Sequence, residues 1–147
     1  VIDEIEYTRF DLSVLLHRQA RKMKKNVFLG LNIAWGANLF IFSPDGITLE
    51  EYCGIHKDAT LDEIRGYNLP LDRFCPNMPE YIANHVIQDV LGGKDIPSVS
   101  PACALLSSLV STEVVLSLIK KRRSMPIVPK YISIDFYKRE LYVGNNS

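Results

Sequence analysis

The chain has 147 residues, which is the size of one domain and long enough to bury a hydrophobic core. Its 17 lysines and arginines balance its 17 aspartates and glutamates, so no overall charge attracts nucleic acid or a membrane surface. The three cysteines have no CxxC spacing, which argues against a disulfide framework or a zinc site and indicates reduced thiols in a cytoplasmic protein. Because the chain opens on Val1 in the middle of an apolar run, we expect it to be part of a longer protein.

The first elements predict a βαβ unit. Residues 1–5 form a short apolar strand, a helix follows from about Leu12 to Lys25, and residues 26–33 are apolar on both faces like a central parallel strand. The predicted inward stripe of the helix is Leu12, Leu15, Leu16, Ala20 and Met23. The opposite face carries His17, Arg18, Arg21, Lys22, Lys24 and Lys25. A phosphate-binding patch is one interpretation of these cations, but without interleaved aromatic residues a solvated face is favoured.

The middle of the chain alternates turns and short helices. Residues 39–42 predict a strand that returns antiparallel to the second one, and Trp35 in the turn is interpreted as a rim or core aromatic, with a ligand platform as the alternative. Two capping boxes, which begin at Thr48 and Thr60, each start a short helix. After an irregular stretch, a further helix is expected from Pro79 to Leu91 with Asn77 as its cap.

The strongest helix signal lies between Ser100 and Arg123. Ser100 is the expected N-cap, Pro101 suits the first turn, and the apolar residues between the ends predict a helix that is buried on most of its surface. A membrane span is the rival interpretation; the interior Glu113, several serines and the marginal length argue against it. Residues 131–136 and 141–143 then predict a terminal antiparallel strand pair.

These elements predict an α/β fold: a Rossmann-like, mostly parallel sheet with flanking helices, a crossover segment and a terminal antiparallel strand pair, forming an incomplete domain. We divide residues 1–147 into the βαβ unit and hairpin (1–52), the crossover segment (53–99), and the long helix with the terminal strands (100–147).

Few sequence motifs indicate chemistry. No GxGxxG, Walker lysine, GxSxG or HExxH pattern is present. The informative cluster is Asp3, Glu4 and Glu6, because carboxylates at the carboxyl end of a sheet strand suit Mg²⁺ beside a phosphate. Simple solvation of these acids is the alternative interpretation.

The order of these segments resembles the second half of a ThiF/MoeB-type domain, the adenylating domain shared with ubiquitin-activating enzymes. Residues 1–21 resemble that family's acidic strand followed by an arginine and a helix, and residues 26–44 resemble its next strand, turn and return strand. Residues 53–99 are similar to the crossover segment that covers the active site, and residues 100–122 to the long helix after it. The resemblance covers most of the chain.

The resemblance implies specific roles. Asp3 and Glu6 would hold Mg²⁺ and ATP, although Glu6 stands where the family has aspartate. Arg9 falls near the family's arginine, and Cys75 lies where some members keep a thioester cysteine, although a buried, unreactive thiol is the favoured state of Cys75. The family's zinc cysteines are missing. Its nucleotide loop, lysine and partner-subunit arginine precede the acidic strand, so this segment alone is expected to be inactive.

Two functions follow as hypotheses. In the first, the parent protein is an ATP-dependent adenylyltransferase that activates the carboxylate of a protein C-terminus or a small molecule. It would act as a homodimer, with a ubiquitin-like or carrier protein as a possible partner and without nucleic acid or membrane. In the second, the same fold is a non-catalytic dimerisation or partner-binding module, as Glu6 and the missing zinc cysteines suggest.

Overall fold

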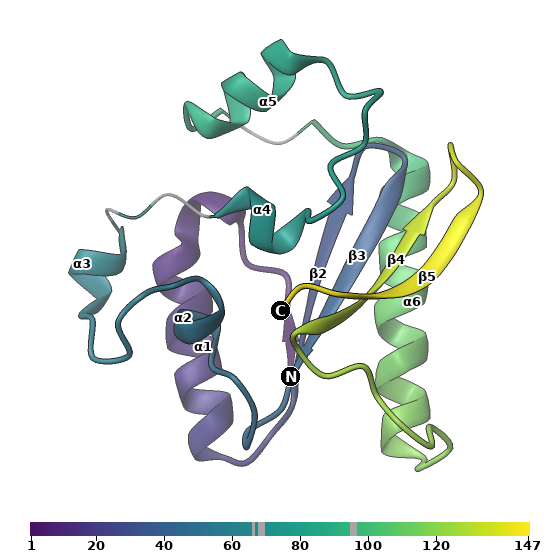
Figure 1. The fold of residues 1–147 in the computed structure, drawn as a ribbon. Coiled ribbons are helices and arrows are strands. Elements are labelled where there is room, and N and C mark those ends of the chain that lie inside the picture. Colours follow the sequence, from purple (N-terminus) through teal and green to yellow (C-terminus); the bar gives the residue numbers. More distant parts are fainter. Residues whose placement is uncertain (66, 68–69, 95–96) are drawn as a thin grey trace.

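A computed structural model describes residues 1–65, 67, 70–94 and 97–147. The described residues form a five-stranded sheet in the order β1-β2-β3-β4-β5, with helices on both faces (Figure 1). The elements are β1 (Ile2–Asp3), η1 (Tyr7–Arg9), α1 (Phe10–Lys22), β2 (Val27–Ile33), β3 (Gly36–Phe42), α2 (Leu49–Tyr52), α3 (Leu61–Arg65), α4 (Leu71–Phe74), α5 (Asn84–Leu91), α6 (Ser100–Leu118), β4 (Lys130–Asp135) and β5 (Glu140–Asn145).

The α/β class, the flanking helices and the terminal antiparallel pair are confirmed, but the expected mostly parallel sheet is wrong. Only β1 and β2 pair in parallel, through the α1 crossover, and the three remaining described pairings are antiparallel. The chain reverses between β2 and β3 in a tight turn, where Ala34 takes a φ of 50°. A two-residue turn of this kind joins antiparallel strands only, since parallel strands need a longer crossover.

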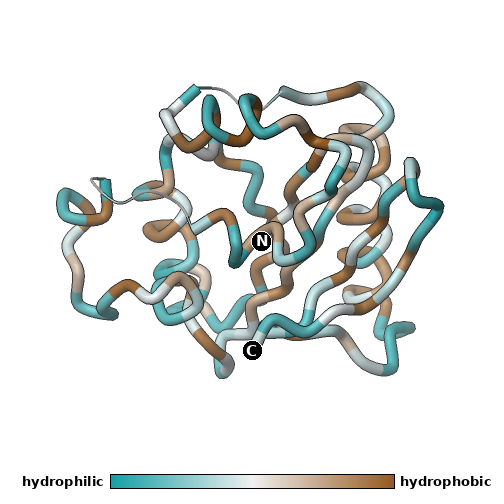
Figure 2. The backbone as a smooth tube through the Cα atoms, turned by 45° about the horizontal axis from the view of Figure 1, so that its top comes forward, coloured by the Kyte–Doolittle hydropathy of each residue, from teal (hydrophilic) through white to brown (hydrophobic). Residues whose placement is uncertain are grey.

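The alternation of β3 divides the core into two layers. Phe40 and Phe42 point to the face that α1, α2 and α4 cover, and they pack there with Tyr52 and Phe74. Residues 39 and 41 point to the opposite face, under α6. Figure 2 shows the hydrophobic residues gathered in these central strands. Because both faces of β3 are covered, all seven of its residues are buried.

The buried stripe of α1 differs from the predicted one. Phe10, Val14, His17 and Ala20 are buried, whereas Leu15 and Met23 of the predicted stripe are exposed. The helix is rotated because Ser13 and His17 turn inward to hydrogen-bond Asp3 at the end of β1. The expectation that His17 belongs to the solvated face is therefore wrong, because its ring lies in the interior.

Helix α6 lies along the sheet on β2 and β3, and only one stripe of it is buried (Figure 1). That stripe is Ala102, Leu106, Val110 and Glu113, so the expectation of burial on most sides is wrong. Among the described residues, α6 is one helix that is long and apolar enough to cross a membrane. Glu113 is the only charged residue of α6. Its buried carboxylate is neutralised by an ion pair with Arg122, which follows the helix.

The close seat of α6 depends on Gly30. A Cβ atom at this position of β2 would lie 2.7 Å from Leu106 Cδ1 and 3.1 Å from Val110 Cγ2. A larger residue would force the Leu106 and Val110 side chains to shift, so glycine lets the helix lie close to the strand.

The crossover segment includes α3, α4 and α5, and residues 66, 68, 69, 95 and 96 of its predicted range lie outside the described part. Both predicted capping boxes are present, at Thr48 and Thr60. Asn77 is not a helix cap, because α5 begins at Asn84. Instead its side-chain amide donates to the hydroxyls of Tyr131 and Tyr142, at 3.0 and 2.8 Å, and fastens the segment to β4 and β5.

Candidate functional site

Asp3 and Glu6 line a small cavity of about 40 Å³ where β1 ends, which we call the acidic cavity. Its other described lining includes Ser13 of α1, Leu31 of β2 and Phe74 of α4. The carboxyl end of a strand in a parallel pair is where α/β folds place ligands, so the predicted location of these acids is retained.

The carboxylate of Asp3 is buried and already bonded. Oδ1 accepts from the Ile5 backbone N–H at 3.1 Å and from the Ser13 hydroxyl at 3.2 Å, while Oδ2 lies 3.1 Å from Nε2 of the buried His17. These bonds join the end of β1 to α1. Both acceptor positions of Oδ1 are occupied, and Asp3 is only 2% exposed.

The two acids that are predicted to hold Mg²⁺ differ in their fitness for it. Glu6 is exposed, and no hydrogen bond occupies its side chain among those described, so it suits a cation that also takes phosphate and water oxygens. Asp3 is buried, with two donors on Oδ1 and His17 beside Oδ2, so a metal would compete with these contacts. No group of three or more His, Cys, Asp or Glu side chains within the described ranges is arranged to hold a metal by itself.

Arg9 lies on the surface beside the acidic edge and is held by Asp11. Its Nε and Nη2 donate to the two oxygens of that buried carboxylate at 3.2 and 3.3 Å. Arg65 of α3 donates to the same carboxylate from the crossover segment, at 3.2 Å. The two guanidinium groups hold the pKa of Asp11 below its usual range, Arg9 through the larger share. Arg9 is thus an accessible cation with an existing counter-ion.

Cys75 is buried at the end of α4, and its thiol lies 3.7 Å from the Met78 sulfur. Burial raises its pKa to about 12, and the same cause raises the pKa of Cys53 to about 12. A thiol with such a pKa is protonated at neutral pH and is a poor nucleophile. The interpretation of Cys75 as a buried, unreactive thiol agrees with this environment, which argues against a catalytic role for it.

The sequence interpretation missed Ser13 and His17, which position Asp3. A signal existed: the two residues are four apart, and so lie on one face of a helix that follows directly after the acidic strand. The run of arginines and lysines obscured it, because those charges made the whole face look solvated.

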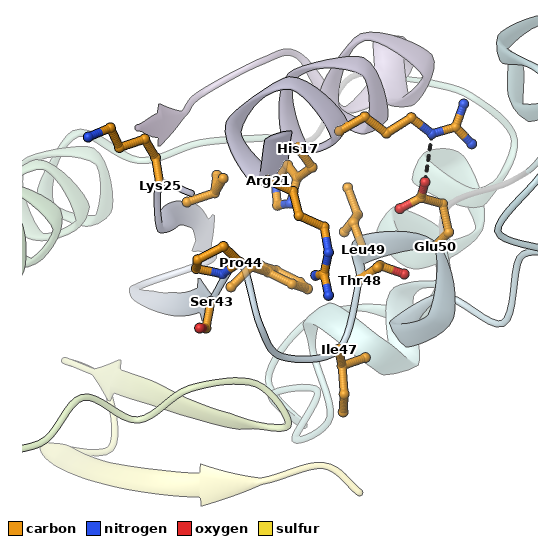
Figure 3. A pocket seen from close by; sticks show the side chains of 12 residues that line it. His17, Arg21, Lys25, Ser43, Pro44, Ile47, Thr48, Leu49 and Glu50 are labelled. Carbon is orange, nitrogen blue, oxygen red and sulfur yellow. Dashed lines mark hydrogen bonds and ion pairs between the residues drawn. The ribbon is translucent and has the colours of Figure 1, made fainter. Parts of the chain in front are cut away.

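A second small pocket, of about 50 Å³, lies at the other end of α1 (Figure 3). It is lined by four of the six basic residues that raised the alternative of a phosphate patch: His17, Arg18, Arg21 and Lys25. Arg18 donates to Glu50 at 2.7 Å and to the Ala59 carbonyl at 2.8 Å, and Arg21 donates to the Gly46 carbonyl at 2.8 Å. These arginines fasten α1 to the segment that follows β3, so their role here is structural.

Two larger hollows separate the crossover segment from the sheet. The first, which we call the apolar pocket, has about 290 Å³ and lies among the β2–β3 turn, α4 and α5. The second, the polar groove, has about 740 Å³ and lies between residues 77–80 and the β4–β5 hairpin. Trp35 lines the apolar pocket and is 43% exposed, which agrees with a rim aromatic.

The fold of the chain is similar to that of solved structures. Three solved structures of E. coli MccB match 98 or 99% of the chain with TM-scores of 0.56 to 0.58, at 12 or 13% sequence identity. Over nearly its whole length, the chain has the fold of part of E. coli MccB. One of those structures holds AMPCPP and selenomethionine MccA, another succinimide, and the third MccA-N7isoASN.

The match covers only part of the MccB chain. The chain spans about a third of the MccB chain, 35 or 36% of it, and at this identity the likeness shows the fold alone. No model of a known protein family matches the sequence, and no curated protein matches it.

Proposed function

We propose that this chain is part of a ThiF-like, ATP-dependent adenylyltransferase that activates a carboxylate as an acyl-adenylate. The observation that carries the proposal is the fold shared with MccB, one structure of which holds AMPCPP, an analogue of ATP. The sequence resemblance to ThiF/MoeB-type domains supports the same relation independently, because it rests on the acidic strand and the order of segments.

In the proposed reaction, an oxygen of the acceptor carboxylate forms a bond to the α-phosphorus of ATP, and the bond from that phosphorus to the bridging oxygen breaks. The products are the acyl-adenylate and pyrophosphate. Catalysis of such a step consists mainly of positioning the reactants and stabilising phosphate charge. Glu6 would hold Mg²⁺, with Asp3 as the second predicted ligand, and Arg9 would face the phosphates.

Further parts of the proposal follow from the resemblance. The crossover segment (53–99) would cover the acceptor, between the βαβ unit with its hairpin (1–52) and the long helix with the terminal strands (100–147). We propose a cytoplasmic homodimer whose acceptor is a peptide or protein C-terminus or a small carboxylic acid. The presence of MccA in two of the MccB structures supports an acceptor beyond ATP itself.

A non-catalytic module of the same fold is the second candidate function. The buried contacts of Asp3 favour it, because a carboxylate that anchors α1 is useful to the fold without any metal. In this case the surface around Glu6 would bind neither ATP nor Mg²⁺.

The deciding experiment is ATP–pyrophosphate exchange by the full-length protein that contains this chain. We expect exchange that needs Mg²⁺ and a carboxylate acceptor, and we expect Glu6→Gln to lower it at least ten-fold. Glu4→Gln is the matched control, because it removes a neighbouring carboxylate that does not line the acidic cavity. Absence of both exchange and ATP binding in the full-length protein would support the non-catalytic module instead.

A further inference from the structure

The apolar pocket is chemically uniform. Its 17 described lining residues carry no formal charge, and they include Trp35, Phe74, Met78, Tyr81 and Val86. The polar groups at its edge are engaged elsewhere: the Asn32 amide donates to Ser98 Oγ at 2.7 Å, and the Tyr81 hydroxyl donates to Asp135 at 3.0 Å. Such a lining favours an uncharged apolar group and disfavours a phosphate or a carboxylate.

The volume of the pocket limits the size of the ligand that it can hold. A volume of about 290 Å³ lies at the small end of the range for ligand pockets, roughly 300–1,000 Å³. A dry apolar cavity of about 150 Å³ is enough to take up benzene. The apolar pocket therefore fits one large aromatic or branched side chain, and not a nucleotide.

The position of the pocket links it to the proposed chemistry. Leu31 and Phe74 line both the apolar pocket and the acidic cavity, so the two hollows share a wall. Ile33, Cys75 and Met78 line both the apolar pocket and the polar groove, which is open to solvent. The apolar pocket therefore lies between the polar groove and the acidic cavity, which Glu6 lines. A molecule that enters from the groove reaches the apolar pocket next to that cavity.

We propose that the apolar pocket selects the acceptor, by binding a large apolar side chain carried next to the carboxylate that is activated. This inference rests on the proposed function, because the position of the carboxylate follows from it. The side chain fills the pocket among Trp35, Met78 and Val86, and the carboxylate stays outside, where charged groups and water remain available. The acceptor is thus a peptide or amino acid that ends in an aromatic or branched aliphatic residue.

The test measures binding of N-acetyl-phenylalanine, N-acetyl-leucine and N-acetylglycine, without ATP, to the full-length protein that contains this chain. Trp35 is the single tryptophan of this chain, and the fluorescence and indole N–H resonance that Trp35→Phe removes report on the pocket. We expect the phenylalanine and leucine derivatives to bind at least ten-fold more tightly than the glycine derivative, with a shift of the Trp35 signals. Equal binding of all three would overturn the proposal.

Two variants on one segment make the test specific. Ala83 lines the pocket, so Ala83→Phe fills it, and we expect at least a ten-fold loss of N-acetyl-phenylalanine binding. His85→Phe adds the same side chain at an exposed position of α5 that does not line the pocket, and binding should be unchanged. If both variants bind like the original chain, or both lose binding equally while folded, the proposal fails.

A third variant guards against misfolding of Ala83→Phe. Val86→Ala enlarges the pocket, and we expect the ratio of affinities for N-acetyl-naphthylalanine and N-acetyl-phenylalanine to rise at least three-fold; an unchanged ratio contradicts the proposal. The outcome is separable from that of ATP–pyrophosphate exchange. Selective binding without exchange would support the preference of the pocket for apolar side chains and contradict the proposed enzyme. Exchange without selective binding would support the enzyme and contradict the assignment of the pocket.

Discussion

At the scale of single residues, the contacts of Asp3 stabilise the fold, and they leave its carboxylate less available to a metal than that of Glu6. Its carboxylate accepts from a backbone N–H and a hydroxyl and contacts a histidine, all of them buried or partly buried. Buried donors that lose their acceptor leave an unpaired polar group in the interior, which is more destabilising than the bond itself is stabilising. The pairing of Asp3 therefore fixes where β1 ends and how α1 is rotated.

We expect Asp3→Ala to lower the free energy of unfolding by about 2–4 kcal/mol, because the Ile5 N–H, Ser13 and His17 lose their acceptor together. Urea denaturation followed by circular dichroism measures this change. Glu6→Gln is the comparison, and it should stay within about 0.5 kcal/mol of the original chain because Glu6 is exposed. A small effect of Asp3→Ala would mean that the carboxylate is available to a ligand.

The cysteines give a second prediction at this scale. Iodoacetamide at pH 8 should modify the exposed Cys103 and spare Cys53 and Cys75, whose pKa values near 12 leave about one thiol in ten thousand ionised. Peptide mass spectrometry after timed labelling distinguishes the three sites, and labelling in urea should reach all of them. Modification of Cys75 at the rate of Cys103 would restore it as a candidate nucleophile.

At the scale of elements, the contact between β2 and α6 sets the thickness of one half of the core. The helix could be predicted from its sequence, since Pro101 and the apolar run indicate it clearly. Its exposure could not, because nearly every position is apolar or small and the pattern does not distinguish one face from another. On the strand side, Gly30 leaves the space that Leu106 and Val110 fill, and no pattern within the helix sequence encodes that contact.

We expect Gly30→Ala to lower the free energy of unfolding by about 1–3 kcal/mol, because the new methyl group overlaps Leu106 and Val110. Gly46→Ala is the matched control, since its Cβ atom would meet its nearest neighbour at 3.5 Å, an ordinary contact. Thermal unfolding compares the two. Adding Leu106→Ala to Gly30→Ala should give less than the sum of the single effects, and strict additivity would argue against the close approach.

The crossover segment is held to the sheet by hydrogen bonds of Asn77 that its sequence does not predict. The sequence predicts Asn77 as a cap because it precedes a helical pattern, and asparagine is a good cap. Its partners, Tyr131 and Tyr142, lie 54 and 65 residues away along the chain, and no local pattern encodes them. We expect Asn77→Ala to increase hydrogen exchange in α4 and α5 while β3 stays protected; unchanged exchange would show that the hydrogen bonds do not hold the segment.

At the scale of the whole molecule, charge determines how stability varies with pH. The pKa values of Asp11, Glu51 and Glu63 are lowered by their hydrogen bonds, to Arg9 first in one case and to capping threonines in the others. A lowered carboxyl pKa stabilises the fold above the usual value, and this stabilisation is lost as the pH falls. The raised pKa values of Cys53 and Cys75 act at the opposite end, where stabilisation is lost as the pH rises above 9.

The chain should therefore be most stable between about pH 5 and 8. Denaturation midpoints measured from pH 3 to 10 test this, and Glu51→Gln with Glu63→Gln should flatten the acid side. An unchanged acid slope in that double variant would assign the loss to other carboxylates.

The α/β class and the terminal hairpin were predictable because each rests on local periodicity. The antiparallel return of β3 beside β2 was predicted as well and is confirmed, because only a short turn separates the two strands. The pairing of β3 with β4 was not predicted, since no local pattern links two strands so far apart in the sequence. Within the acidic cluster, the sequence located the carboxylates but could not separate the anchored Asp3 from the exposed Glu6, because that difference arises from residues 13 and 17.

The bridge of Arg9, Asp11 and Arg65 has a consequence for how an anion would be received. If Arg9 turns toward an incoming phosphate, Asp11 is not left uncompensated, because Arg65 remains bonded to it. Arg9 can therefore leave its counter-ion without stranding a buried negative charge. Because Arg65 belongs to the crossover segment, an anion that draws Arg9 away would leave Arg65 as the main partner of Asp11, and this ion pair would hold the segment more firmly to α1.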